Sequence, residues 1–147
     1  MTVRDIDAFA AALLGGEPYI ETIPGAELAP SPIQGFGLFS KRAWAPGEVL
    51  CRLDGQVVDV RRHPAVLDAL EWNAVSPDLL LVRPLRTSYG FINHSTRPNV
   101  AIDGNGYTMR ACLPIAPGDE FTMDYFAQPV PKAYLASGEA AVLRRSS

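Results

Sequence analysis

The sequence predicts a β-rich α+β fold, because short strand-like segments separated by turn residues fill most of the 147-residue chain. Turn signals occur at Pro46-Gly47, at Asp54-Gly55 and in the Asp-Gly-Asn-Gly run at 103–106. Helical patterns fall mainly near the two ends of the chain. With 48% hydrophobic and 20% charged residues, the composition is that of an ordinary globular protein, and we expect one domain over 1–147.

The N-terminal flank, 1–30, is expected to hold a short helix and a short strand. Three apolar residues fall on one helical face within 5–14, and Gly15-Gly16 ends the pattern, so this helix should pack on the domain. These residues are Ile6, Phe9 and Leu13. Aromatic and β-branched residues at 19–23 predict a strand. The three prolines within 24–34 predict a loop.

Apolar and β-branched runs of strand length recur through the middle of the chain. They lie at 38–39, 49–53, 57–60, 79–82, 100–102 and 107–112. The segment 57–60 is expected to pair close to 49–53 after the Asp54-Gly55 turn. The last two segments flank the Asp-Gly-Asn-Gly run, which is the clearest hairpin signal in the sequence.

Two further helical stretches are expected. The first begins at His63-Pro64, continues through Val66, Leu67 and Leu70, and takes in Glu71-Trp72. The second covers the tail at 131–145, with a soft point at Ser137-Gly138. These helices complete an α+β pattern in which the strands dominate.

Composition also excludes several classes of function. The net charge is −3 and no basic block is present, so direct nucleic-acid binding is not expected. No apolar run approaches the roughly 20 residues that cross a bilayer, and Asp5 and Asp7 do not fit a signal peptide. We therefore expect a cytoplasmic protein in which Cys51 and Cys112 remain reduced thiols.

Three motifs concentrate the chemistry. The loop 91–99 runs from Phe-Ile into Asn-His-Ser-Thr-Arg-Pro-Asn, and so many anchored polar groups suggest a ligand that satisfies them. Gly35-Phe36-Gly37 would let backbone pass close to a ligand. The segment 117–126 reads as a turn into a strand with Phe121 and Met123 on one face, and it ends in Tyr-Phe.

Together, and in this order, the three motifs resemble those of the SET-domain methyltransferases. The resemblance covers about 31–126, between the N-terminal flank and a helical C-terminal segment, 127–147, that would close the site. It implies a fold of several small sheets with a C-terminal pseudoknot, of the small single-domain type without zinc-binding modules. It also implies the cofactor S-adenosyl-L-methionine and the methylation of a lysine.

The resemblance assigns roles to individual residues. Gly35, Phe36 and Gly37 would approach the methionine part of the cofactor, Asn93 would bind its amino-acid end, and His94 would contact the adenosine. Tyr125 would be both the catalytic tyrosine and a cofactor contact. Phe126 and Tyr134 are alternative covers for the adenine, and the sequence does not choose between them.

The substrate channel departs from the family pattern. Leu53 and Ile102 stand where channel tyrosines are common, and Met123 occupies the position that helps set methyl multiplicity. We expect these three residues to line the channel with Tyr89. Thr96 replaces a zinc-binding cysteine, so no metal is expected.

Methyl transfer to lysine requires a neutral side-chain amine. Deprotonating the lysine ammonium at pH 7 costs about 4.6 kcal/mol, and an apolar channel lowers this cost. The activity that the resemblance implies is lysine methylation of a protein. Because the channel is altered, three alternatives stay open: the substrate is a small-molecule amine or amino acid, the cofactor is used in another reaction, or the protein is a binding module without catalysis.

A hydrolase in which His94 is the base and Ser95 the nucleophile is disfavoured, because no carboxylate stands at a spacing suited to orient the histidine. Both a monomer and a homodimer remain open.

Overall fold

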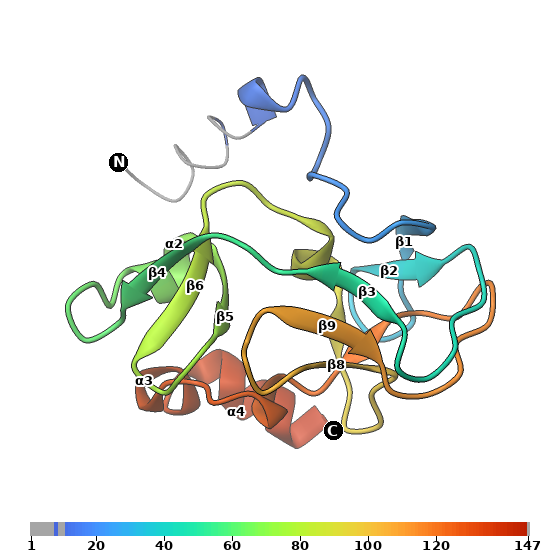
Figure 1. Ribbon diagram of the computed structural model, residues 1–147. Helices are drawn as coiled ribbons and strands as arrows, with labels where there is room; N and C mark the ends of the chain where they lie inside the picture. Colours follow the sequence, from blue (N-terminus) through green and yellow to red (C-terminus); the bar gives the residue numbers. More distant parts are fainter. Residues whose placement is uncertain (1–7, 9–10, 147) are drawn as a thin grey trace.

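Small β-sheets dominate the computed structural model, which describes residue 8 and residues 11–146 (Figure 1). Within these residues, the sheet orders are β1-β2, β10-β7, β3-β9-β8 and β4-β6-β5. The described helices are short, such as α2 (Val66–Ala69), and the longest of them, α4 (Gly138–Ser146), lies at the C-terminal end. The expected β-rich α+β architecture is therefore confirmed.

The β1–β2 hairpin corrects the expected loop at 24–34. Strand β1 (Ala26–Pro30) pairs antiparallel with β2 (Phe36–Ser40), from Ala26 opposite Ser40 to Pro30 opposite Phe36. Three prolines indicated a loop, but a proline is tolerated at the end of an edge strand, where its missing N–H is not needed. The strand expected at 19–23 is also wrong, because only Ile20 makes a single bridge, to Thr87.

The predicted hairpin at 100–112 is confirmed. Strand β8 (Val100–Ile102) pairs with β9 (Thr108–Ala111), and β9 also pairs with β3 (Val49–Arg52). Strand β4 (Gln56–Asp59) does not join this sheet, so its expected pairing near β3 is wrong. Gly55 turns the chain away with φ +139°, and it lies so close to Val82 that an added Cβ would sit 2.4 Å from the Val82 carbonyl oxygen.

Strand β6 (Leu79–Arg83) accordingly pairs with β4 on one side and with β5 (Glu71–Ala74) on the other. Helix α2 ends at Ala69, so the expected extension into Glu71-Trp72 is wrong. The backbone of Trp72 pairs with Val82 across the sheet, and its indole N–H donates to the Leu67 carbonyl. Tertiary pairing thus overrides the local helical pattern.

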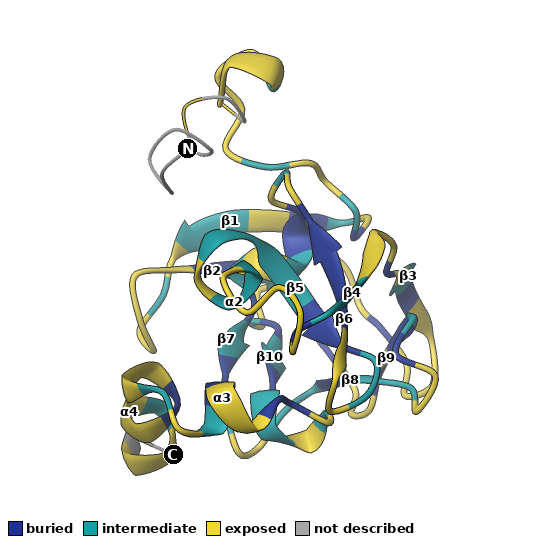
Figure 2. Ribbon diagram, turned by 90° about the vertical axis from the view of Figure 1, so that its left-hand side faces the viewer, coloured by how far each residue is buried: buried dark blue, intermediate teal, exposed yellow. Residues whose placement is uncertain are grey.

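The C-terminal motif runs beside the central motif. Strand β10 (Thr122–Met123) pairs parallel with β7 (Asn93–His94), placing Thr122 opposite Asn93 and Met123 opposite His94. Phe121, Met123 and Ile92 are all buried in the main hydrophobic core. Figure 2 shows β7 and β10 side by side. Two segments almost 30 residues apart are thereby fixed side by side, as the expected pseudoknot requires.

The C-terminal helices α3 (Lys132–Leu135) and α4 (Gly138–Ser146) confirm the predicted helical tail and its break. Ala8 and residues 11–13 are helical, while Ile6 and Phe9 lie outside the described residues. Leu13 is 59% exposed, so the expected packing of its side chain on the domain is wrong. Among the described helices, none has the length and apolar character to span a membrane.

Candidate functional site

Asn99 ties the two paired motifs together. Its side-chain amide donates to the Glu120 carbonyl at 2.8 Å, and its side-chain oxygen accepts from the Thr122 N–H at 2.8 Å. The backbone adds a bond from Ser95 N–H to the Met123 carbonyl at 3.0 Å. Because these bonds flank β7 and β10 (Figure 2), they fix where the chain emerges toward Tyr125. The asparagine at the end of the 91–99 loop is therefore structural.

Asn93 and Gly37 meet through Glu120. The Asn93 amide donates to Glu120 Oε2 at 2.8 Å, and the Ser31 hydroxyl donates to both carboxylate oxygens at 2.7 and 2.9 Å. A Cβ on Gly37 would lie 2.3 Å from Glu120 Oε2, so any larger residue there would displace the carboxylate. Sequence reasoning missed Glu120 because the turn before it suggested a solvated carboxylate.

The glycine motif is exposed at its first two residues and buried at its third. Phe36, between the two glycines, is 59% exposed, whereas Gly37 is buried. The Asn93 amide also donates to the carbonyls of Gln34 and Phe36, at 3.2 and 3.1 Å. Gly35, Phe36, Gly37 and Asn93 thus lie close together.

His94 is packed between two aromatic rings. Its ring centroid lies 5.2 Å from that of Tyr125 and 5.2 Å from that of Phe126. His94 Nδ1 accepts the Tyr125 backbone N–H at 3.1 Å, so that nitrogen carries no proton in this arrangement. Asp124 Oδ1 lies 3.8 Å from the same nitrogen. The imidazole therefore positions the start of η2 (Tyr125–Ala127).

The Tyr125 hydroxyl proton is used in a hydrogen bond within the protein. Its hydroxyl donates to the carbonyl of Ile92, directly before Asn93. Burial raises the pKa of Tyr125 above its usual value, so the phenol stays neutral. A phenol whose proton is already donated can still accept hydrogen bonds through its oxygen lone pairs. Tyr125 is thus suited to hold a cationic or N–H-bearing group.

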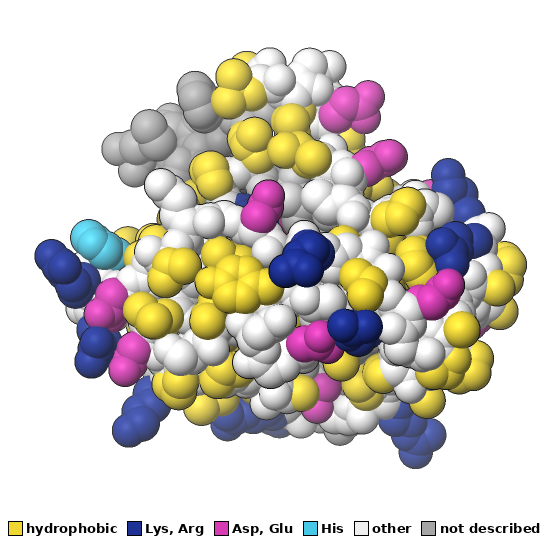
Figure 3. Space-filling model, viewed as in Figure 1, with side chains coloured by type: hydrophobic (Ala, Val, Ile, Leu, Met, Phe, Trp, Pro, Cys, Tyr) yellow, Lys and Arg dark blue, Asp and Glu magenta, His cyan; other side chains and the backbone are white. Residues whose placement is uncertain are grey.

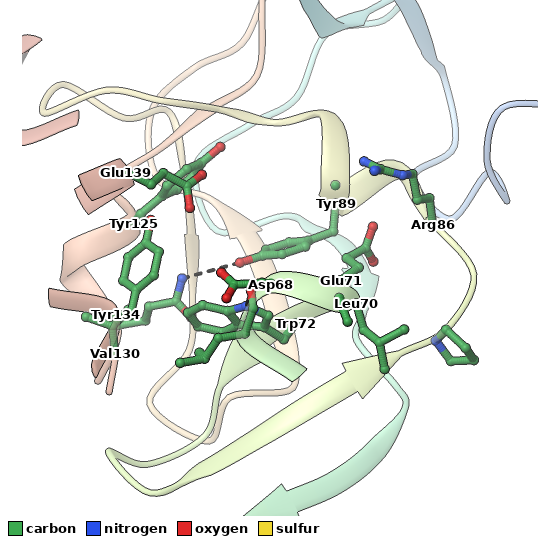
Figure 4. Close-up of a pocket in the computed structure, with 15 residues that line it drawn as sticks. Asp68, Leu70, Glu71, Trp72, Arg86, Tyr89, Tyr125, Val130, Tyr134 and Glu139 are labelled. Atoms are coloured by element: carbon green, nitrogen blue, oxygen red, sulfur yellow. Dashed lines mark hydrogen bonds between the residues drawn. The ribbon is translucent and has the colours of Figure 1, made fainter. Parts of the chain in front are cut away.

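Tyr125 also forms part of the wall of a cavity of about 330 Å³, within the range of small-ligand sites (Figure 4). Its lining comes from α2, β5, η1 (Ser88–Phe91) and the C-terminal helices. The lining residues are Leu67, Asp68, Ala69, Leu70, Glu71, Trp72, Pro84, Arg86, Tyr89, Gly90, Tyr125, Gln128, Val130, Tyr134 and Glu139. Three tyrosines and three carboxylates therefore line one space.

An aromatic stack closes one side of this cavity. The Tyr134 ring lies 5.2 Å from Trp72, edge to face, and 6.1 Å from Phe126, stacked. The Arg144 guanidinium lies 5.1 Å from the Phe126 ring. Tyr134 lines the cavity, whereas Phe126 supports it from behind and contacts His94. Tyr134 is thus the aromatic residue of the two that faces the cavity.

The four residues expected in the substrate channel belong to the main hydrophobic core or pack against it, but they do not line one cavity. Tyr89 lines the large cavity. Ile102 and Met123 line a smaller one of about 50 Å³, and Gln128 lines both. Leu53 is buried in the main core and lines neither cavity.

A buried ion pair missed by the sequence reasoning supports the wall of the large cavity. Arg83 Nε lies 2.6 Å from Glu71 Oε2, and the side chains are only 5% and 6% exposed. Glu71 also accepts the Thr87 N–H and hydroxyl at 2.9 and 2.6 Å, just before η1. A Cβ on Gly90 would lie 2.3 Å from Glu71 Oε1. The pair therefore holds the turn that leads into Asn93.

Charged side chains of both signs are mixed on the face shown in Figure 3, where Lys and Arg lie among acidic and apolar side chains.

The described residues offer few groups for metal binding or thiol chemistry. Cys51 and Cys112 are free thiols. Across the described part of the chain, no group of three or more His, Cys, Asp or Glu side chains could hold a metal ion.

Comparison with protein families identifies a domain that covers most of the candidate site. Residues 35–126, more than half of the chain, match the family model described as SET domain. The matched range begins at the glycine motif, contains the 91–99 loop, and ends after Tyr125 at Phe126. No match to a curated protein was found.

Proposed function

Since the chain belongs to the SET-domain family, whose members are typically methyltransferases, we propose that it uses S-adenosyl-L-methionine to methylate a lysine amine in a protein. The observation that carries the proposal is the position of Tyr125. Its backbone is bonded to His94, its hydroxyl to Ile92, and its side chain forms part of the wall of the 330 Å³ cavity. The tyrosine therefore links the cofactor motif to a space of ligand size.

The residues around Asn93 fit the amino-acid end of such a cofactor. Asn93 Oδ1 has no hydrogen-bond partner among the described residues, while its amide nitrogen donates to Glu120. The Asn93 oxygen and the Glu120 carboxylate are two acceptors of the kind that suits an ammonium group. When bound, S-adenosyl-L-methionine supplies the methyl group and its sulfonium leaving group.

The chain's own contribution to transfer would be orientation and electrostatics. The Tyr125 oxygen can accept an N–H of the substrate amine and so hold it in place. Burial raises the pKa of Tyr89 to about 12 and that of Tyr125 further, so both phenols remain neutral acceptors or donors at neutral pH. The aromatic walls of the cavity would lower the cost of about 4.6 kcal/mol for releasing the lysine proton, whereas its carboxylates Asp68, Glu71 and Glu139 would attract the charged ammonium.

A small-molecule amine is the second candidate substrate. It is favoured by Leu53, Ile102 and Met123, because Leu53 lines neither cavity and the other two line only the smaller one, so none of them lines the large cavity beside Tyr125. Incubation with methyl-labelled cofactor, L-lysine and a mixture of unmodified proteins would separate the two. Label in the protein fraction supports the first proposal, and label in the small-molecule fraction supports the second.

The test of catalysis is Tyr125→Phe, compared with Tyr107→Phe. Tyr107 lines neither cavity and provides a matched loss of a phenol hydroxyl. Tyr125→Phe should lower methyl transfer by roughly a hundredfold, with a cofactor Kd within about threefold of the wild type. Tyr107→Phe should change neither. Full activity in Tyr125→Phe would exclude the catalytic role, and no transfer by the wild type to any acceptor would favour a silent binding module.

A further inference from the structure

Two tyrosines of the large cavity have opposite hydrogen-bond polarity. The Tyr125 hydroxyl donates its proton to Ile92 and keeps its lone pairs. The Tyr89 oxygen instead accepts a hydrogen bond from Gln128 Nε2 at 3.3 Å, as the dashed line in Figure 4 marks. An amide nitrogen has no lone pair to offer, so Tyr89 cannot be the donor in this bond.

The direction of the Gln128 amide is fixed by β5. The backbone N–H of Ala74 donates to Gln128 Oε1 at 2.7 Å, so the amide oxygen must face the strand and the amide nitrogen must face Tyr89. The result is a polarised series from Ala74 through Gln128 to Tyr89. Each bond in such a series strengthens the donor at its end.

The proton of Tyr89 is left for a partner in the cavity. Among the described residues, none accepts a hydrogen bond from this hydroxyl. Desolvation by burial raises the pKa of Tyr89 to about 12, so the proton remains on the oxygen. The Arg83 guanidinium, 5.0 Å from the ring centre, also draws electron density from the phenol. The Tyr89 hydroxyl is therefore available as a hydrogen-bond donor in a cavity large enough for a small ligand.

We propose that Tyr89 donates a hydrogen bond to an acceptor atom of the ligand in this cavity, and that Gln128 is the positioning residue that sets its direction. The acceptor would be a carboxylate or carbonyl oxygen or an aromatic ring nitrogen. Such an atom can belong to the cofactor or to the methyl acceptor. The inference rests on the proposed function only in naming these two sources. With Tyr125 as acceptor and Tyr89 as donor, the cavity distinguishes ligands by the placement of both groups.

Three variants test the polarity. Tyr89→Phe removes the donor and keeps the ring. Gln128→Glu keeps the acceptor for Ala74 N–H and nearly the same shape, but its second carboxylate oxygen accepts the Tyr89 proton and turns the phenol lone pairs toward the cavity. Tyr107→Phe is the matched control. Thermal unfolding of each variant verifies folding.

The readouts separate the two sources of the acceptor. Titration calorimetry with S-adenosylhomocysteine measures binding of the cofactor product, and the KM for the methylated protein or L-lysine measures the acceptor. Tyr89→Phe and Gln128→Glu should each weaken one of these by about three- to tenfold. In the Tyr89→Phe background, Gln128→Glu should add little, because no phenol proton remains to redirect.

The outcomes are distinct. A weaker S-adenosylhomocysteine Kd places the acceptor atom on the cofactor, and a higher KM with unchanged Kd places it on the substrate. Either supports the inference. If the wild type binds and transfers methyl groups but both variants match it, the inference is overturned and the proposed function stands. If the wild type binds neither S-adenosylmethionine nor S-adenosylhomocysteine, both are overturned.

Discussion

Replacing Glu71 by alanine should destabilise the protein by about 3–5 kcal/mol, because it leaves a buried guanidinium without its counter-charge. The Glu71 and Arg83 side chains are 6% and 5% exposed, so water reaches the space left by the carboxylate only from the cavity that Glu71 lines. The same change removes the acceptor of Thr87, directly before η1. The substitution should therefore lower the stability of the protein and also loosen the turn that leads to the candidate site.

The magnitude follows from the bonds that are lost and kept. Alanine removes three accepted hydrogen bonds, from Arg83 Nε at 2.6 Å and from the Thr87 N–H and hydroxyl at 2.9 and 2.6 Å. Arg83 keeps its bonds to the Asp54 carbonyl and to Asn73 Oδ1, at 2.9 and 2.8 Å, which limits the loss. For a chain of this size, about 2–4 °C per kcal/mol gives a fall in Tm of roughly 6–20 °C.

The assay is urea unfolding, with Asp78→Ala as the matched control. Asp78 pairs with Arg61 at 3.5 Å, and these side chains are 51% and 67% exposed. Loss of such an exposed pair should cost no more than about 1 kcal/mol. If Glu71→Ala costs no more than Asp78→Ala, the Glu71–Arg83 pair does not stabilise the fold as argued.

Gly37→Ala should weaken binding of S-adenosylmethionine by at least about tenfold, because its Cβ would lie 2.3 Å from Glu120 Oε2 and displace the carboxylate that binds the motif asparagine. Gly104→Ala is the control, since nothing lies within 4 Å of its added Cβ, and equal calorimetric affinities would refute the prediction. Cys51 should resist alkylation by iodoacetamide at pH 8, because burial raises its pKa to about 11, and fast labelling by mass spectrometry would contradict this. From about pH 9 to 11 the unfolded chain loses this proton before the folded one, so the free energy of unfolding should fall with rising pH. Cys51→Ala should reduce that fall in alkaline urea titrations.

Local signals predicted those elements whose pairing partner is close in sequence. The β8–β9 hairpin was foreseen because the Asp-Gly-Asn-Gly run at 103–106 specifies a tight turn between two apolar segments. Strand β5 was not foreseen, since Trp72 becomes extended through its pairing with Val82 on β6. Prolines near β1 indicated a loop, although an edge strand accommodates Pro30.

In the candidate site too, local sequence signals identified single residues but not their distant partners. Gly37 and Asn93 were identified from their motifs, but the carboxylate that joins them was not, because Glu120 lies 27 residues from Asn93 in sequence. The channel residues were placed by resemblance, and in the structure Tyr89 and Met123 line different cavities. Motifs thus indicated which residues matter, and only tertiary contacts showed how they combine.

The central claim is that the region around Asn93 holds S-adenosylmethionine, and calorimetric titration of the cofactor into wild type and Asn93→Ala tests it most directly. The wild type should bind one cofactor per chain. The variant should bind at least about tenfold more weakly, since it loses a side-chain oxygen suited to a charged ammonium group. An absence of binding to the wild type, or equal affinity in both proteins, would contradict the claim.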